Sequence, residues 1–186
     1  MTEDKRTLVI QLCGGPGTGK STLCAEVFAR LKRMGVECEM APEYAKDKVW
    51  EGSLAVLENQ IYVFGKQQHR MYRLRGSVEV IVTDAPLVAT VHYDRTRNPH
   101  LRGLVLSEME KYRALTYLIE REEDYSTVGR TQTREETVEV DRSMQRTLDE
   151  CGVKYERVRR GPDLAGYIAA DAMAAIGRSD AGSLRI

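Results

Sequence analysis

Short apolar runs alternate along the chain with longer segments in which apolar residues recur at helical spacing. The apolar runs have the length of strands and are rich in valine, isoleucine and leucine. They predict strands at 7–13, 36–40, 78–83, 115–120 and 153–158, and the segments between them predict helices at 21–34, 53–74, 87–93, 134–151 and 164–176. Alternation of this kind is typical of an α/β fold with a five-stranded, mainly parallel sheet flanked by helices.

Two segments interrupt this alternation. Residues 121–133 are polar and charged, include Gly129 and have no apolar period, although predicted packed elements lie on both sides. A segment of this kind suits a loop that closes over a ligand, so we predict a lid at about 121–133. Residues 178–186 are mostly small or polar and predict a flexible tail. The remainder, 1–177, is expected to form a single domain.

Composition narrows the classes of function. The 186 residues include 28 basic and 28 acidic side chains, so the formal net charge is zero. This balance argues against a protein that coats nucleic acid by electrostatics alone, although it permits a local basic groove. The cysteines, Cys13, Cys24, Cys38 and Cys151, lack metal-binding spacing and indicate reduced thiols in a cytoplasmic protein. No stretch has the pattern of a signal peptide or a membrane span, so we expect no membrane partner.

The glycine-rich segment after the first predicted strand carries the clearest chemistry. Residues 14–21 read Gly-Gly-Pro-Gly-Thr-Gly-Lys-Ser, the P-loop pattern G-x-x-x-x-G-K-S, and a predicted helix follows. The backbone N–H groups of such a loop cradle phosphates, its lysine reaches the β- and γ-phosphates, and its serine holds Mg²⁺. The positive end of the helix dipole adds to the same anion site. A glycine-rich turn without a ligand is the alternative, and the flanking strand and helix argue against it.

We therefore predict a site for ATP and Mg²⁺, with GTP as the alternative donor. The residues predicted to bind the nucleotide are Gly14, Gly15, Pro16, Gly17, Thr18, Gly19, Lys20, Ser21 and Thr22, with Lys20 also catalytic and Ser21 also a metal ligand.

Two acidic residues follow predicted strands. Glu43 comes after the strand at 36–40, and Asp84 comes directly after the strand at 78–83. Because ligands of open parallel sheets bind outside the carboxyl ends of the strands, both residues are expected beside the P-loop. Either one suits the base that takes a proton from an acceptor hydroxyl, and Asp84 is also the candidate Mg²⁺ ligand. The alternatives are a helix cap for Asp84 and a solvated loop carboxylate for Glu43.

Arginines on and beside the predicted lid are candidates for phosphate contacts. Phosphoryl transfer spreads negative charge over the equatorial oxygens, which arginines on a closing loop can meet. We therefore expect Arg130 or Arg134 to be catalytic, and Arg121 is a further candidate. Solvated surface charges are the alternative for each of them.

Three further features give weaker signals, and the first two have two interpretations each. Gln60 and Gln67 suit the recognition of a base edge, or they are polar residues beside a core stripe. The basic loop at 94–102 suits contact with a substrate phosphate or a nucleic-acid backbone, or it is plainly solvated. The segment Arg159-Arg160-Gly161-Pro162 is placed by topology to flank an adenine.

Together these segments resemble the nucleoside- and nucleotide-kinase branch of the P-loop proteins. Ala-Pro-Glu-Tyr-Ala at 41–45 and Thr-Asp-Ala-Pro-Leu at 83–87 look like the small kinases grouped with the nicotinamide-riboside kinase domain. Phage-encoded members of this kind, similar to thymidylate kinase, include kinases of 5-hydroxymethyluracil in DNA. The resemblance implies nucleotide binding at 14–22, an acidic role at Glu43 or Asp84, and lid arginines at Arg130 or Arg134.

The sequence thus favours a kinase that transfers the γ-phosphoryl group of ATP to a hydroxyl of a nucleoside-like acceptor. The resemblance implies 5-hydroxymethyl-deoxyuridine in phage DNA, during thymine hypermodification in the host cytoplasm. Free nucleosides, nicotinamide riboside and nucleoside monophosphates are alternative acceptors. A regulatory P-loop NTPase is the alternative class, although the sequence lacks the base-specifying Asn-Lys-x-Asp of many such switches. A monomer and a homodimer are both compatible with the sequence.

Overall fold

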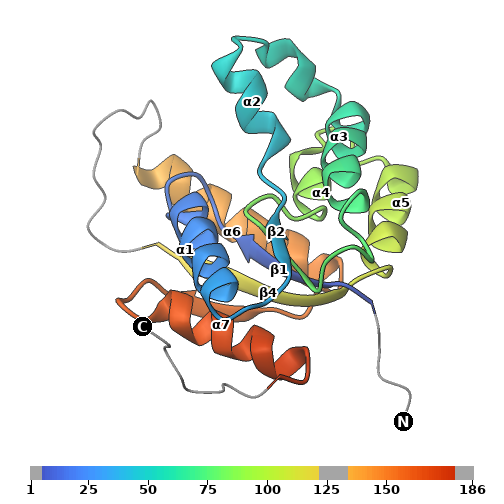
Figure 1. The fold of residues 1–186 in the computed structure, drawn as a ribbon. Coiled ribbons are helices and arrows are strands. Elements are labelled where there is room, and N and C mark those ends of the chain that lie inside the picture. The colour runs from blue at the N-terminus through green and yellow to red at the C-terminus, as the bar shows by residue number, and fades with distance from the viewer. Residues whose placement is uncertain (1–5, 122–133, 179–186) are drawn as a thin grey trace.

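A parallel sheet with helices on both faces forms the frame of the molecule (Figure 1). The computed structural model describes residues 6–121 and 134–178. Within these residues the strands are β1 (Leu8–Cys13), β2 (Cys38–Met40), β3 (Val80–Thr83), β4 (Arg113–Glu120) and β5 (Glu156–Arg159). Their order is β2-β3-β1-β4-β5, and every neighbouring pair is parallel. The predicted α/β fold with five strands is therefore confirmed, and β1 delivers the P-loop at the centre of the sheet.

The helices occupy the connections between the strands. They are α1 (Lys20–Arg33), α2 (Tyr44–Trp50), the 3₁₀ helix η1 (Leu54–Glu58), α3 (Gln60–Tyr72), α4 (Ala89–Tyr93), α5 (Pro99–Met109), α6 (Arg134–Glu150) and α7 (Leu164–Ala175). We call the segment from α2 to α3, residues 44–72, the arm. In Figure 1 the arm rises beyond the body of the sheet on the same side as the start of α1. No helix among the described residues is long and apolar enough to cross a bilayer.

Alternate residues of β1 point to opposite faces of the sheet, and both faces are covered. Leu8, Ile10 and Leu12 pack with residues of α1 and α7 such as Leu31 and Ile168, all of which are fully buried or nearly so. On the other face, residues of β1 and β3 pack with α3 and α5, and a third apolar cluster joins β4 to α4 and α6. A parallel sheet buried on both faces explains why its strands are nearly continuous apolar runs in the sequence.

The predicted helix at 53–74 is confirmed over α3 but is wrong as one continuous helix, because the chain breaks between η1 and α3. Asn59 adopts φ −91° and ψ 84°, and its side chain accepts a hydrogen bond from the Tyr62 N–H, so it caps a new helix. The sequence also failed to predict α2, which begins directly after Glu43. The arm therefore consists of short helical pieces rather than one long helix.

The basic loop predicted at 94–102 is wrong in its second half, which forms the first turn of α5. Asn98 accepts hydrogen bonds from the N–H groups of His100 and Leu101, and Pro99 occupies the first helical position. The other predicted ends differ from the observed ones by up to three residues. Residues 122–133 of the predicted lid and 179–186 of the predicted tail lie outside the described residues.

We expect Leu31→Ala to lower the free energy of unfolding by about 2–5 kcal/mol, because Leu31 is fully buried between α1 and the sheet. Leu104→Ala is the matched control, because Leu104 on α5 is half-exposed, and it should cost less than about 0.5 kcal/mol. Chemical denaturation of both variants measures the difference. Equal losses would contradict this packing of α1.

Candidate active site

The P-loop curls from the end of β1 into the N-terminus of α1. Gly14, Gly17 and Gly19 have φ values of 144°, 80° and 85°, which residues with a side chain rarely adopt. The buried Thr18 hydroxyl donates to the Gly15 carbonyl at 3.1 Å and closes the turn. Because the loop leads directly into the first turn of α1, its N–H groups and the helix dipole act at the same place. This geometry is that of an anion site.

Lys20 reaches back across the loop. Its Nζ atom donates to the carbonyl oxygens of Gly14 and Gly15, at 2.8 Å each. Burial lowers the pKa of this ammonium group, and the carboxylates of Glu43 and Asp84 oppose that effect. Lys20 is therefore a desolvated cation whose attraction for a phosphate is screened little by water.

Ser21 and Asp84 meet at the edge of the loop. The Ser21 hydroxyl donates to Oδ2 of Asp84 at 2.6 Å, and Asp84 is buried. Its other oxygen, Oδ1, is buried with no hydrogen-bond partner among the described residues. A hydroxyl beside a carboxylate with one unsatisfied oxygen fits Mg²⁺, bound directly or through water. The alternative role of Asp84 as a helix cap is not observed, because α4 begins after Val88 without a side-chain cap.

Glu43 lies between the P-loop and the arm, at the N-terminal boundary of α2. Its side chain makes no cap hydrogen bond to that helix. Burial raises the pKa of the Glu43 carboxyl, while Lys20 lowers it and Asp84 raises it. Glu43 is thus a partly buried group beside Lys20 and Asp84 rather than the solvated loop carboxylate that was the alternative.

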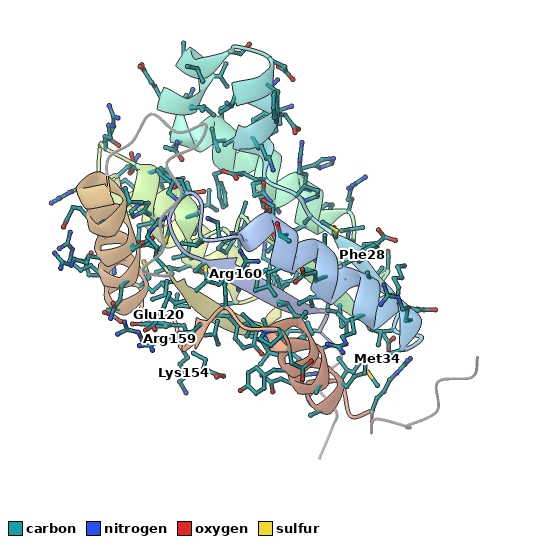
Figure 2. All side chains as sticks on the ribbon, turned by 90° about the vertical axis from the view of Figure 1, so that its left-hand side faces the viewer. Phe28, Met34, Glu120, Lys154, Arg159 and Arg160 are labelled. Carbon is teal, nitrogen blue, oxygen red and sulfur yellow. The ribbon has the colours of Figure 1, made fainter. Side chains whose placement is uncertain are left out.

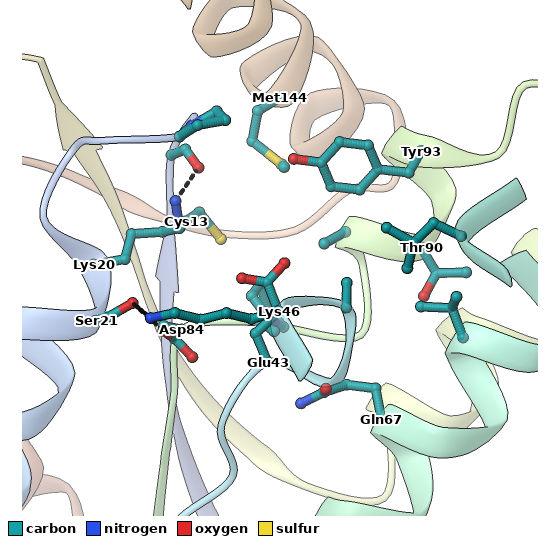
Figure 3. Close-up of a pocket in the computed structure, with 18 of the residues that line it drawn as sticks. Cys13, Lys20, Ser21, Glu43, Lys46, Gln67, Asp84, Thr90, Tyr93 and Met144 are labelled. Carbon is teal, nitrogen blue, oxygen red and sulfur yellow. Dashed lines mark hydrogen bonds between the residues drawn. The ribbon is translucent and has the colours of Figure 1, made fainter. Parts of the chain in front are cut away.

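These groups open into one cavity of about 1050 Å³. Figure 3 shows Lys20, Ser21 and Asp84 on one side, Gln67, Thr90 and Tyr93 on the other, and Glu43 and Lys46 between them. The arm contributes an apolar wall made by Val49, Leu54, Leu57 and Val63. A volume of this size exceeds what phosphates alone require, so the cavity has room for a second molecule beside the P-loop.

A carboxylate from α6 contacts the backbone of the P-loop. The Gly15 N–H donates to Oδ1 of Asp141 at 2.7 Å, and Arg121 Nε donates to Oδ2 of the same carboxylate at 2.8 Å. Arg121 also donates to the Pro16 carbonyl at 2.9 Å. A Cβ atom at position 15 would collide with the Asp141 carboxylate. Asp141 therefore explains a glycine at a position that the P-loop pattern leaves open.

The comparison with protein families decides the classification, because residues 9–162 match the family described as "AAA domain". The chain belongs to the AAA domain family. No curated protein sequence matches it.

Two solved structures share the fold of this AAA domain. The structure of NadR in complex with NR has a TM-score of 0.61 and 18% identity, and the match covers 93% of this chain and 52% of the NadR chain. Thymidylate kinase from Ehrlichia chaffeensis has a TM-score of 0.56 and 10% identity, and the match covers 92% of this chain and 98% of the thymidylate kinase chain. The present chain thus spans about half of the NadR chain. At these identities the likeness shows the fold alone, which this chain shares with NadR and with a thymidylate kinase.

The structure brings together only some of the residues predicted for this AAA domain. The P-loop, Glu43 and Asp84 converge, but Arg130 and the side chain of Arg134 lie outside the described residues. The Gln67 amide holds the backbone at Ala41 and Tyr44, which favours its interpretation as a structural polar residue. The candidate Gln60 lines the cavity while it donates to the Leu57 carbonyl at 2.7 Å.

Arg160 and Arg159 behave differently, although they are adjacent. The guanidinium group of Arg160 packs against Gly19, with Nη1 2.6 Å from where a Cβ would stand, so it borders the P-loop (Figure 2). Arg159 pairs with Glu120 at 2.7 Å. Of the two arginines in the predicted segment 159–162, Arg160 is therefore the one that lies against the P-loop.

The sequence pattern did not single out several residues that line the cavity, nor Asp141 beside the P-loop. Lys46 donates to the Ser21 hydroxyl at 3.5 Å, and Thr90 and Tyr93 line the opposite wall. Lys46 was missed because it lies on α2, which the apolar pattern did not predict. Asp141 was missed because it lies 126 residues from its partner Gly15 in a helix rich in other acidic residues.

We expect Gly15→Ala to lower stability by about 1–3 kcal/mol, because the added methyl group displaces the Asp141 carboxylate from the Gly15 N–H. Asp141→Ala should cost more, because it removes that hydrogen bond and also the contacts of the carboxylate with Arg121. The double variant should lose little more than Asp141→Ala alone. Gly103→Ala is the control, because a methyl group there meets no atom within 4 Å and the site is helical. Thermal unfolding measures all four proteins, and additive losses in the double variant would refute the coupling.

Stability should also respond to the charge of Glu43. Burial raises the pKa of the Glu43 carboxyl in the folded state above its value in the unfolded state. The carboxyl therefore contributes its whole stabilisation at pH values below the unfolded-state pKa. This stabilisation is lost as the pH rises through the folded-state pKa. Glu43→Gln should therefore raise the melting temperature at about pH 8 and give no gain at about pH 4. Glu26→Gln on an exposed part of α1 is the control. A gain that does not change with pH would contradict the burial of Glu43.

Proposed function

We propose that this protein is an ATP-dependent kinase that transfers the γ-phosphoryl group to a hydroxyl of a nucleoside-like acceptor. The observation that carries this proposal is the single cavity in which Lys20, Ser21 and Asp84 face Glu43, with further room along the arm. A triphosphate site alone would serve hydrolysis or transfer. A second compartment beside a partly buried carboxylate favours transfer to a bound acceptor.

We assign each residue of the site a separate role in the reaction. The P-loop backbone would hold the phosphates, and Lys20 would meet the charge that develops on the transferred group. Ser21 and Asp84 would hold Mg²⁺, which supplies charge neutralisation between the phosphates when it is bound. Asp84 is engaged with Ser21, so we assign the base to Glu43. A raised pKa brings a carboxylate closer to the operating pH and makes it a better acceptor for the hydroxyl proton.

The nature of the acceptor is supported by the comparisons. One similar structure is NadR bound to NR, and another is a thymidylate kinase, so two proteins of this fold carry nucleoside or nucleotide names. Among nucleoside-like acceptors we propose 5-hydroxymethyl-2′-deoxyuridine in DNA, following the resemblance of segments 41–45 and 83–87. An acceptor within a polymer needs an open entrance. Val49 and Leu54 line the cavity and are still 55% and 58% exposed, which supports a wide mouth at the arm.

The test is transfer of labelled γ-phosphate from ATP with Mg²⁺ to a panel of acceptors. The panel contains 5-hydroxymethyluracil DNA, unmodified DNA, free deoxynucleosides, nicotinamide riboside and nucleoside monophosphates. We expect label in the 5-hydroxymethyluracil DNA and none in unmodified DNA. Label in a small nucleoside would overturn the DNA acceptor but keep the kinase. Label released only as free phosphate would overturn the kinase and favour a regulatory NTPase.

Variants assign the roles in the same assay. Lys20→Ala should abolish transfer, because it removes the ammonium group that reaches back across the P-loop to Gly14 and Gly15. Glu43→Gln should lower kcat by about 10²-fold or more while ATP affinity changes little. Asp84→Asn should instead raise the Mg²⁺ concentration that half-maximal activity requires. Equal, small effects of the two carboxylate variants would contradict both assignments.

A further inference from the structure

The carboxylates of the site lie on two separate loops. Glu43 belongs to the segment that leaves β2, and Asp84 belongs to the segment that leaves β3. The strands pair up to Met40 and Val82, and the Ala41 N–H adds one more hydrogen bond to the Val82 carbonyl at 2.9 Å. Beyond that point the sheet no longer fixes the two loops relative to each other.

A buried threonine connects the loops where the sheet ends. The Thr83 hydroxyl, with 0% of the residue exposed, donates to the Ala41 carbonyl at 2.7 Å. The same hydroxyl accepts a hydrogen bond from the Ala85 N–H at 3.1 Å. It therefore holds the backbone two residues before Glu43 and the backbone directly after Asp84.

A buried glutamine from the arm holds the other side of Glu43. Oε1 of Gln67 accepts from the Tyr44 N–H at 2.9 Å, and its Nε2 donates to the Ala41 carbonyl at 3.4 Å. Gln67 is 5% exposed, so both contacts lie in a region of low dielectric. One amide thus spans the dipeptide Pro42-Glu43, and the Ala41 carbonyl accepts from both Gln67 and Thr83.

We infer that Thr83 and Gln67 are positioning residues that fix the Glu43 carboxylate relative to Asp84 and the P-loop. This inference rests on the proposed function, because it takes Glu43 as the base. Neither side chain needs to touch the substrate for this role. Thr83 satisfies the Ala85 N–H, Gln67 satisfies the Tyr44 N–H, and the two share the Ala41 carbonyl. A kinase gains from that order, because small misplacements of a catalytic group reduce the rate strongly.

The charged and titratable groups that face Glu43 influence the pKa of its carboxyl. They are Lys20 at the start of α1, Asp84 after β3, Lys46 on α2, and Tyr93 on α4, whose pKa is raised by its own burial and by Glu43. None of them is changed when Thr83 or Gln67 is replaced. A shift in the pKa of Glu43 in such variants therefore reports a change in the hydration of its carboxyl or in its position relative to these groups, Asp84 included.

The decisive variants are Thr83→Val and Thr83→Ser. Valine keeps the shape of threonine without the hydroxyl, and serine keeps the hydroxyl with less volume. We expect Thr83→Val to lower kcat by about 10–100-fold, with KM for ATP changed less than about threefold. Thr83→Ser should recover most of that kcat. A Thr83→Val enzyme within about twofold of the wild type, or a serine variant as poor as valine, would overturn the inference.

Gln67→Leu provides a second, independent variant, because it removes both amide contacts from the arm without altering β3. It should lower kcat in the same way as Thr83→Val, with a smaller effect on ATP affinity measured by direct binding. Retained kcat in a folded Gln67→Leu protein would confine positioning to Thr83 and overturn the inference for Gln67. Circular dichroism and ATP binding establish that each variant is folded.

Carboxyl-carbon NMR separates this inference from the proposed function. The titration of Glu43 in the whole chain needs no acceptor and no turnover. We expect its raised pKa in the wild type to move toward the ordinary value in Thr83→Val and to stay raised in Thr83→Ser. If the wild type transfers no phosphate but these shifts occur, the proposed function fails and the positioning role stands. Unchanged titration in all variants would refute the positioning role, whatever the activity.

Discussion

The parallel pairing of β3 with β1 and β2 is the constraint on which the site depends. Parallel strands end at the same edge of a sheet, so β1 delivers the P-loop, β3 delivers Asp84 and β2 leads to Glu43 at one place. The apolar clusters on both faces hold these strand ends still. The 2.6 Å hydrogen bond between Ser21 and Asp84 is a direct consequence, because it joins loops that neighbouring strands bring together.

The features that could be predicted correctly are those that short segments of the sequence determine by themselves. The apolar run of β1 and the glycines at 14, 17 and 19 specify a buried strand and a turn with positive φ, and neither depends on distant residues. The placement of Glu43 and Asp84 followed from one general rule about parallel sheets. For these elements the fold and the centre of the site were predictable together.

The missed features depend on contacts between distant segments. The apolar spacing over 53–74 continues through the break at Asn59, which is decided by a side-chain cap rather than by periodicity. Gln67 has the same local pattern whether it reads a base or holds backbone, and only the position of Ala41 and Tyr44 distinguishes the two. Asp141 meets Gly15 because α6 packs beside the end of β1, which no local signal reveals.

The charges that line the cavity indicate how a triphosphate is accommodated. Among the described residues, Lys20, Lys46 and Arg95 face the carboxylates of Glu43, Glu58 and Asp84, so the cations of the wall are already offset. Arg121 adds little net charge, because it pairs with Asp141. Phosphates brought into this balanced, partly desolvated space need a further source of positive charge. The backbone N–H groups of the P-loop and the Arg160 guanidinium group beside Gly19 supply part of it, and a divalent cation at Ser21 and Asp84 would supply more. The same hydroxyl and carboxylate that the sheet brings together therefore make phosphate binding and metal binding interdependent.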